Sequence, residues 1–177
     1  MSYRERAATA PIDDPRPSAL LVTAALRARI VAHVVAAVPC ESVGLLGVAR
    51  GPRPDIVRAM RLYAGTNVDA SPTRYTMDPA EVISALRDIE TNGWWLGAIV
   101  HSHPASPAVP SATDLREAYY PDALMVIVSL ARGTPEIRSW RLVSDPTASA
   151  SFVEVPILAD LEQAPQPTTE SLKDERP

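Results

Sequence analysis

Two of the three histidines in the chain stand one residue apart, at His101 and His103. On a β-strand, side chains two positions apart share a face, and their attachment points lie about 6.6 Å apart. Two imidazoles at that separation can reach one metal ion at Zn–N distances of about 2.0–2.1 Å. The pair alone is weak evidence, because paired histidines on strands are often ordinary surface or packing residues. Metal ligation is the chemistry that the rest of the sequence must support or exclude.

A carboxylate lies eleven residues beyond His103, at Asp114, after a segment that contains three prolines. Prolines lower the conformational entropy of a loop, so a distant ligand is held at a smaller ordering cost. Two histidines and one carboxylate leave a fourth tetrahedral position open, which is the pattern of a catalytic zinc site. Ser111 and Asp114 also have the spacing of a capping box, in which Ser111 caps a helix. The two interpretations can hold together.

The histidine pair needs a strand beneath it, and the apolar, β-branched run at 96–101 predicts a buried one. The helix predicted at 23–38 begins at the cap Thr23 and ends before Pro39. Its apolar face is expected to consist of Leu26, Ile30, Val31 and Val34. Further helices are predicted at 78–90 and 111–120, and further strands at 42–49, 55–63, 73–77, 124–131, 137–143 and 151–155. Strands interleaved with helices predict an α/β layered domain.

The two ends of the sequence differ from its middle in composition. Residues 1–17 are polar and interrupted by prolines, which predicts a flexible N-terminal arm. Residues 162–177 have almost no apolar side chains, so burial cannot offset the entropy of ordering them, and we expect a disordered C-terminal tail. The folded body is therefore expected to be one domain over 18–161.

Charge and hydropathy exclude several classes of partner. The net charge of −4 and the pI near 5.4 argue against broad nucleic-acid binding, which needs a cationic face. No stretch approaches the ~18 apolar residues of a transmembrane helix, and the N-terminus lacks the apolar core of a signal peptide. A single cysteine, Cys40, allows no disulfide within the chain. We expect a cytoplasmic protein that binds neither nucleic acid nor membrane.

An acid at Glu41 stands just before the strand predicted at 42–49 and, taken alone, is typical of a solvated loop. Combined with His101-Ser-His103, seven further residues and Ser111-x-x-Asp114, it resembles the complete signature of the JAMM (MPN+) metallopeptidase family. That signature is Glu, then His-Ser/Thr-His-x7-Ser-x-x-Asp, and all five functional positions match. The combination is far more specific than its parts.

The resemblance extends over most of the folded body. The segment TNVDASPTRYTMDPAE at 66–81 resembles the corresponding segment of short bacterial and archaeal members, among them hydrolases of sulfur-carrier proteins. Many bacterial relatives carry Glu-x-Cys-Gly, whereas this chain has Glu41-Ser-Val-Gly44 with its cysteine at Cys40. The departure leaves the metal site untouched and leaves fine specificity open.

The resemblance implies a fold and a role for each matching residue. The fold is cytidine-deaminase-like, a single JAMM/MPN domain with a mixed β-sheet flanked by helices. His101, His103 and Asp114 would bind Zn²⁺. Glu41 would act as general base, and Ser111 would donate a hydrogen bond to the oxyanion.

The function implied is a zinc-dependent peptidase acting on a ubiquitin-like (β-grasp) or sulfur-carrier protein. It would cleave the amide or isopeptide bond after the C-terminal Gly-Gly, releasing cysteine or another adduct. The alternatives are an isopeptidase that removes a ubiquitin-like modifier from protein lysines, a non-catalytic MPN interaction scaffold, and a RadC-like DNA-associated protein. The sequence leaves the partner, the adduct and the oligomeric state open.

The remaining notable side chains have simpler interpretations. His33, on the first predicted helix, and Ser102, on the face opposite the histidine pair, are assigned to packing or support. Cys40 has no neighbouring histidine to activate it as a nucleophile. One residue of the Trp94–Trp95 pair is expected in the core and the other in a substrate groove. Tyr75 and Asn67 are further groove candidates.

Overall fold

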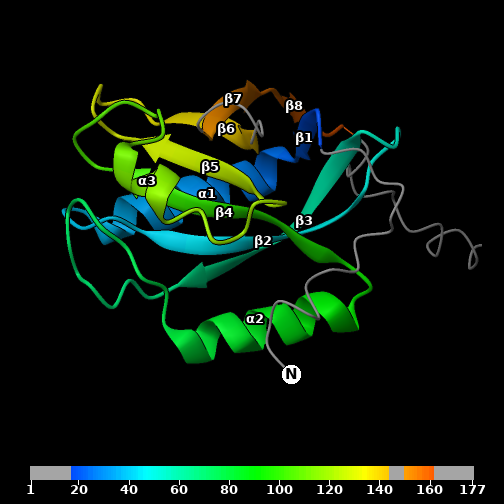
Figure 1. Cartoon of the computed structure of the whole chain (residues 1–177), viewed down its shortest axis with the longest axis horizontal. Helices are drawn as coiled ribbons and strands as arrows, with labels where there is room; N and C mark the ends of the chain where they lie inside the picture. The colour runs from blue at the N-terminus through cyan, green and yellow to red at the C-terminus, as the bar shows by residue number, and fades with distance from the viewer. Residues whose placement is uncertain (1–16, 144–149, 162–177) are drawn as a thin grey trace, which may run out of the picture.

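The chain folds around one mixed β-sheet with helices on both faces (Figure 1). The structure is a computed structural model, and it describes residues 17–143 and 150–161. The strands are β1 (Ala19–Val22), β2 (Val43–Arg50), β3 (Ile56–Gly65), β4 (Trp95–His103), β5 (Leu124–Ser129), β6 (Glu136–Val143), β7 (Ser151–Val155) and β8 (Ile157–Ala159). The helices are α1 (Ala24–Ala37), α2 (Pro79–Thr91) and α3 (Ala112–Arg116).

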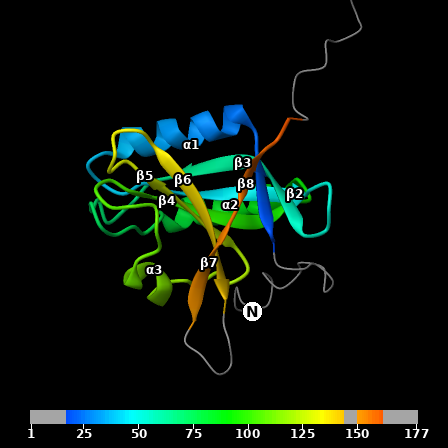
Figure 2. The same cartoon turned by 90° about the horizontal axis from the view of Figure 1, so that it is seen from above.

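The strand order in the sheet is β7-β6-β5-β4-β2-β3-β1-β8. β4 pairs antiparallel with β2 and parallel with β5, so the strand that ends in the histidine pair is covered on both sides. The two outermost strands, β7 and β8, are consecutive in the chain, and only Pro156 separates them. Because this one ribbon pairs with β6 and then with β1, the sheet curls into a nearly closed form (Figure 2). The predicted α/β class is confirmed.

Alternation along β2 assigns its two faces to the two long helices. Leu46 and Val48 pack with α1, whereas Val43 and Leu45 pack with the side chains of α2. Figure 1 shows α2 running below the sheet, and Figure 2 shows α1 on a different side of it. The sheet that carries the histidines is therefore held between apolar layers.

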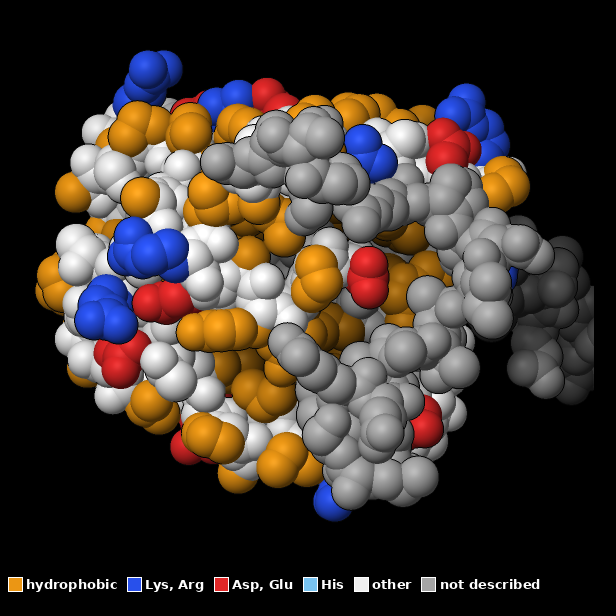
Figure 3. All heavy atoms as spheres, in the orientation of Figure 1, with side chains coloured by type: hydrophobic (Ala, Val, Ile, Leu, Met, Phe, Trp, Pro, Cys, Tyr) orange, Lys and Arg blue, Asp and Glu red, His pale blue; other side chains and the backbone are white. Residues whose placement is uncertain are grey.

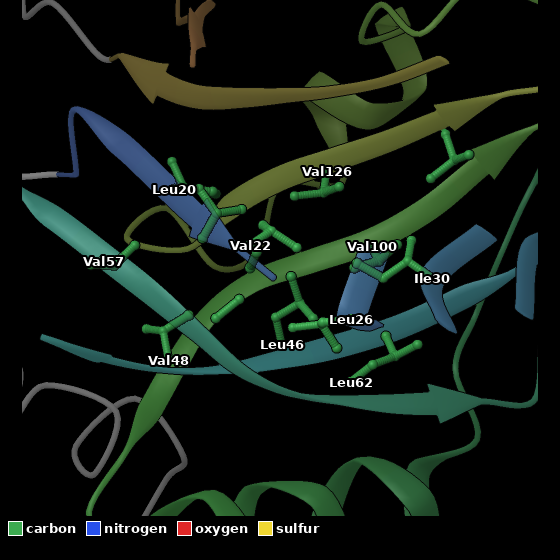
Figure 4. Close-up of a cluster of buried hydrophobic side chains, with 14 of the residues drawn as sticks. Leu20, Val22, Leu26, Ile30, Leu46, Val48, Val57, Leu62, Val100 and Val126 are labelled. Atoms are coloured by element: carbon green, nitrogen blue, oxygen red, sulfur yellow. The ribbon is translucent and has the colours of Figure 1, made fainter. Parts of the chain in front are cut away.

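The main core lies between α1 and the enclosing strands (Figure 4). Leu26, Ile30 and Val34 are all at most 5% exposed, at the spacing that puts them on one helix face. Full burial of such a side chain stabilises the fold by roughly 1.5–3 kcal/mol. Val31, predicted on the same face, is only half-buried, so the buried stripe is narrower than expected.

The structure corrects two predicted elements. The segment 73–77 is not a strand, because only Met77 forms an isolated bridge, with Asn67. The helix predicted at 111–120 ends at Arg116. Pro121 disfavours helical geometry in the residue before it, which helps to end the helix early. The aromatic pair Tyr119–Tyr120 therefore lies beyond the helix, and Tyr119 is 78% exposed.

Two strands were missed, and parts of the prediction fall outside what the structure describes. β1 and β8 have four and three residues, too short to show an alternating pattern. The predicted arm and tail lie outside the described residues, except for Pro17. Within the described ranges, no helix combines the length and the apolarity that crossing a bilayer would require.

Candidate metal centre and active site

The end of β4 and the start of α3 bring three ligand-type side chains together. His101 Nε2 lies 3.2 Å from His103 Nε2 and 3.3 Å from Asp114 Oδ1, and His103 Nε2 lies 3.7 Å from Asp114 Oδ2. Tetrahedral ligands at zinc bond lengths of about 2.0–2.1 Å are themselves about 3.3 Å apart. All three side chains are buried. The donor set therefore has both the chemistry and the spacing of a zinc site.

The ring of His103 is oriented by a main-chain carbonyl. Its Nδ1 lies 2.7 Å from Pro107 O, so Nδ1 carries the proton and donates it. That tautomer leaves the Nε2 lone pair facing the cluster, which is how a metal-binding histidine is fixed by its second nitrogen.

The ring of His101 is fixed by stacking. It is fully buried and lies against Tyr75, with ring centroids 4.6 Å apart and planes inclined at 24°. Burial lowers the pKa of His101 to about 4, although the charge of Asp114 opposes this. The neutral imidazole is the form that binds metals.

Asp114 completes the capping box of α3 and faces the histidines at the same time. The Ser111 main-chain N–H donates to Asp114 Oδ2 at 2.6 Å, and the Asp114 N–H donates to Ser111 Oγ at 3.1 Å. Both halves of the predicted capping box are present. Burial raises the pKa of Asp114, but the neighbouring His103, His101 and Ser111 outweigh it and hold that pKa below its usual range.

The proline-containing loop between His103 and Ser111 is anchored to the neighbouring strands. Ser129 Oγ donates to Ser106 O at 2.6 Å, and Trp140 Nε1 donates to Ala108 O at 3.0 Å. Ala108 is fully buried in a small cluster with side chains of β5 and β6. These anchors, together with the prolines, hold Asp114 against the end of β4.

Glu41 lies in the same cleft as the cluster, just before β2. It is 7% exposed, so its interpretation as a solvated loop residue is wrong. Burial raises the pKa of Glu41 to about 7, although the charge of His103 opposes the shift. A carboxyl group in this range can accept a proton and return it near neutral pH.

The cleft has a volume of about 350 Å³. It is lined by Glu41, Pro72, Thr73, Arg74, Tyr75, His103, Ala105, Ser106, Ser111, Thr113, Asp114 and Glu117. Four of the five predicted site residues are in this lining, and His101 lies behind them. Arg74 Nη2 and Glu117 Oε1 approach within 3.6 Å and join the loop before α2 to the end of α3. Figure 1 shows both segments at the same end of the sheet, on the left of the view.

Other residues singled out in the sequence lie outside the cluster. Ser102 Oγ accepts a hydrogen bond from Ser42 N–H at 2.8 Å, in the supporting role expected for it. His33 Nε2 lies 2.9 Å from Val43 O, and the ring is thereby engaged in tying α1 to β2. Cys40 is half-buried and does not line the cleft.

The structure corrects the expectation that one of the two tryptophans lies in a substrate groove. Trp95 packs against the main core, and Trp94 lies beneath the Arg61 guanidinium, 5.4 Å from it. Neither lines the cleft. Trp95 begins β4 and Trp94 precedes it, and at about 3.3 Å per residue they lie roughly 26–30 Å along the strand from His103.

The sequence did not predict the supporting roles of two groups at the site. The Pro107 carbonyl that orients His103 is a main-chain group, which no residue pattern reveals. Tyr75 was a groove candidate, but its stack on His101 depends on a loop that the sequence predicted as a strand.

Comparison with known proteins identifies the family. Residues 23–143 match the family described as prokaryotic homologs of the JAB domain. The chain belongs to the prokaryotic JAB family. The resemblance to JAMM metallopeptidases is thereby confirmed, and so is the expectation of a JAMM-type hydrolase.

Two curated proteins and one solved structure resemble the chain over 49% to 80% of its length. The CysO-cysteine peptidase of Mycobacterium tuberculosis is 36% identical over 126 residues, which cover 70% of this chain and 83% of that protein. A probable TtuB-protein conjugate cleaving protease of Thermus thermophilus is 41% identical over 88 residues, 49% of this chain and 55% of that protein. The solution structure of protein DSY2949 from Desulfitobacterium hafniense superposes with a TM-score of 0.69 at 36% identity. The superposition covers 80% of this chain and 92% of the DSY2949 chain.

Proposed function

We propose that this JAB protein is a zinc-dependent hydrolase that cleaves the bond after the C-terminal Gly-Gly of a ubiquitin-like or sulfur-carrier protein. The observation that carries the proposal is the convergence of His101, His103 and Asp114 in one cleft with Glu41. The relatives support it, because one is named for a CysO–cysteine bond and another for TtuB–protein conjugates.

In this proposal His101, His103 and Asp114 hold zinc. The fit rests on the donor separations of 3.2 to 3.7 Å and on the neutral form that burial favours in His101. A bound zinc ion supplies Lewis acidity, which activates water and polarises a carbonyl group.

Glu41 moves the proton. Its carboxylate accepts the proton of the attacking water as the oxygen adds to the scissile carbonyl carbon. The protonated carboxyl then returns it to the nitrogen as the C–N bond breaks, so the products are a free carboxylate and an amine. The raised pKa, about 7, suits a group that must do both.

Ser111 stabilises the negative oxygen that develops on the carbonyl. Its Oγ accepts a hydrogen bond from Asp114 N–H and lines the cleft, where the hydroxyl group can donate to an oxygen of a bound substrate. One such donor is typically worth about 2.7–4 kcal/mol in the transition state.

The substrate tail must enter the cleft without pairing as an additional strand beside β4, which carries the histidines. Val43 of β2 pairs with His101, Ser102 N–H donates to Ser42 O, and β5 pairs with β4 through His103, so both sides of β4 are taken as far as Ser102. An extended Gly-Gly tail therefore finds its partners along the loop walls of the cleft, at 72–75 and 105–106. Glycine suits the scissile position, because a bulky residue there would push the carbonyl away from Ser111.

The decisive experiment uses a β-grasp carrier protein ending in Gly-Gly with cysteine joined to its C-terminus. We expect release of cysteine by the wild type and a loss of roughly 10²–10⁴-fold in kcat for Glu41→Gln. Carriers in which the last or the penultimate glycine is alanine, and casein as a generic substrate, are the comparisons. Equal cleavage of all of these would replace the proposal with a nonspecific peptidase.

The second candidate is an isopeptidase that releases the carrier from protein lysines, and the name of the Thermus relative favours it. To separate the two activities, kcat/KM is measured for the carrier joined to cysteine and for the same carrier joined to a lysine side chain. The substrate with the higher kcat/KM identifies the preferred activity. The complete set of three ligands argues against the non-catalytic scaffold. Figure 3 shows Lys and Arg side chains interspersed with Asp and Glu, not a cationic field, on the face that it draws, which gives the DNA-associated alternative no support there.

A further inference from the structure

We propose that Asn67 is a positioning residue that fixes Glu41 against the cleft. Its side-chain amide makes four hydrogen bonds. Nδ2 donates to Glu41 O and to Arg74 O, both at 2.9 Å. Oδ1 accepts from the main-chain N–H groups of Asp69 and Thr76, both at 3.1 Å. Two donors and two acceptor sites are the full capacity of an amide, so this side chain is committed entirely to the protein.

The main chain of Glu41 depends on this segment. Its carbonyl accepts from Asn67 Nδ2, and its N–H donates to Ser71 O at 2.8 Å. Glu41 lies two residues before β2 begins at Val43, outside the ladder that fixes the strand. Both polar groups of its peptide backbone are thus held by the 67–71 turn.

The same amide joins Glu41 to the wall of the cleft. Through the Arg74 carbonyl and the Thr76 N–H it shapes the stretch that contains Tyr75, whose ring stacks on His101. Asn67 does not line the cleft, so it acts through these neighbours and does not touch a substrate. The groove position expected for Asn67 is therefore corrected to a place behind the wall.

The turn has a fixed base. Thr66 N–H and Thr66 Oγ donate to the Glu81 carboxylate at 2.6 and 2.9 Å, and Asp78 N–H donates to Thr66 O at 3.0 Å. Glu81 and the cap Asp78 belong to the start of α2. Thr66, the residue before Asn67, is therefore bonded to the helix, and this fixes the position from which Asn67 binds Glu41.

Removing the donor should release Glu41 while leaving the fold in place. In Asn67→Asp the Oδ1 acceptor remains for Asp69 and Thr76, but a carboxylate oxygen replaces Nδ2 and faces the carbonyl oxygens of Glu41 and Arg74. A displacement of about 1 Å in a reacting group can cost ~10²-fold in rate.

The first test needs no substrate and stands apart from the proposed function. Amide hydrogen exchange by ¹⁵N NMR should show Glu41 N–H, which donates to Ser71 O, exchanging about tenfold faster or more in Asn67→Asp, because the turn that holds both Glu41 backbone groups loses its bond to the Glu41 carbonyl. Asn92→Asp is the matched control, because Asn92 Nδ2 also donates to a carbonyl, Asp88 O at 2.7 Å, at the far end of α2. Unchanged exchange at Glu41 in Asn67→Asp would overturn the inference.

The second test rests on the proposed function and uses a double-mutant cycle. We expect Asn67→Asp to lower kcat by roughly 10–10²-fold with little change in KM, but by less than about threefold when Glu41→Gln is also present. An equal loss in both backgrounds would show that Asn67 does not act through Glu41. If the wild type cleaves no carrier, the proposed function fails while the exchange result still decides the inference. Should Asn67→Asp fail to fold, Asn67→Ser is measured in the same way.

Discussion

Tyr75 lines the cleft and stacks on the buried ring of His101, with 4.6 Å between ring centroids. The contact joins a loop residue to a strand residue and restricts the imidazole to one orientation. A ligand that is already oriented loses less freedom when a metal ion binds.

That contact can be tested with two substitutions. Tyr75→Phe keeps the ring and should bind zinc within about twofold of the wild type. Tyr75→Ala leaves His101 free on that side, and we expect about tenfold weaker zinc binding, in the range typical of groups that orient a metal ligand. Competition with a chromophoric chelator measures both. Identical affinities for the two variants would show that the stack does not orient His101.

Zinc content tests the cluster directly. We expect about one zinc per chain in protein purified without chelator, because three protein ligands form a single site. The double variant His101→Ala, His103→Ala should lose it. His33→Ala is the control, since it removes the chain's third histidine, whose ring bonds to the Val43 carbonyl away from the cluster. Equal zinc in the wild type and in the double variant would eliminate the site.

The raised pKa of Glu41 gives the metal-free protein a pH-dependent stability. Between its ordinary value of 4.5 and about 7, the folded chain keeps a proton on Glu41 that the unfolded chain has released. The free energy of unfolding should therefore fall as pH rises through this window, by up to about 3 kcal/mol from this residue. Urea unfolding of chelator-treated wild type and Glu41→Gln at pH 4.5 and 7.5 isolates the effect. The same pH dependence in both proteins would contradict the prediction.

Gly97, in the strand that carries the histidines, has no room for a side chain. An added Cβ would lie 2.2 Å from the Val48 side chain on the neighbouring strand. We expect Gly97→Ala to destabilise the protein by about 1–3 kcal/mol, the usual cost of overpacking. Adding Val48→Ala opens space and should lower that cost relative to Val48→Ala alone, as denaturant titration of all four proteins would reveal. Full additivity of the two substitutions would argue against the clash.

Local patterns predicted the parts of the site that local physics builds. The strand under His101 and His103 follows from an apolar, β-branched run, and the capping box of Ser111 and Asp114 follows from spacing alone. Both depend on interactions within a few residues, so the local sequence is sufficient to predict them.

Tertiary contacts decided what the sequence could not predict. Glu41 looked solvated because the turn at 67–71 that binds its main chain, and the cleft that its side chain lines, are formed by segments distant in the sequence. The stretch at 73–77 has strand-forming residues, yet the Asn67 side chain takes the Thr76 N–H that a ladder would need. The family resemblance located Glu41, whereas its surroundings became visible only in three dimensions.

Pro156 has a mechanical consequence. Because β7 and β8 form one ribbon across the two margins of the sheet, β8 cannot peel away from β1 without pulling on β7 where it pairs with β6. The sheet then lacks an independent strand from which unzipping could start. We expect force or denaturant to open it in one cooperative step, and a chain cut at Pro156 to yield at both margins under milder conditions.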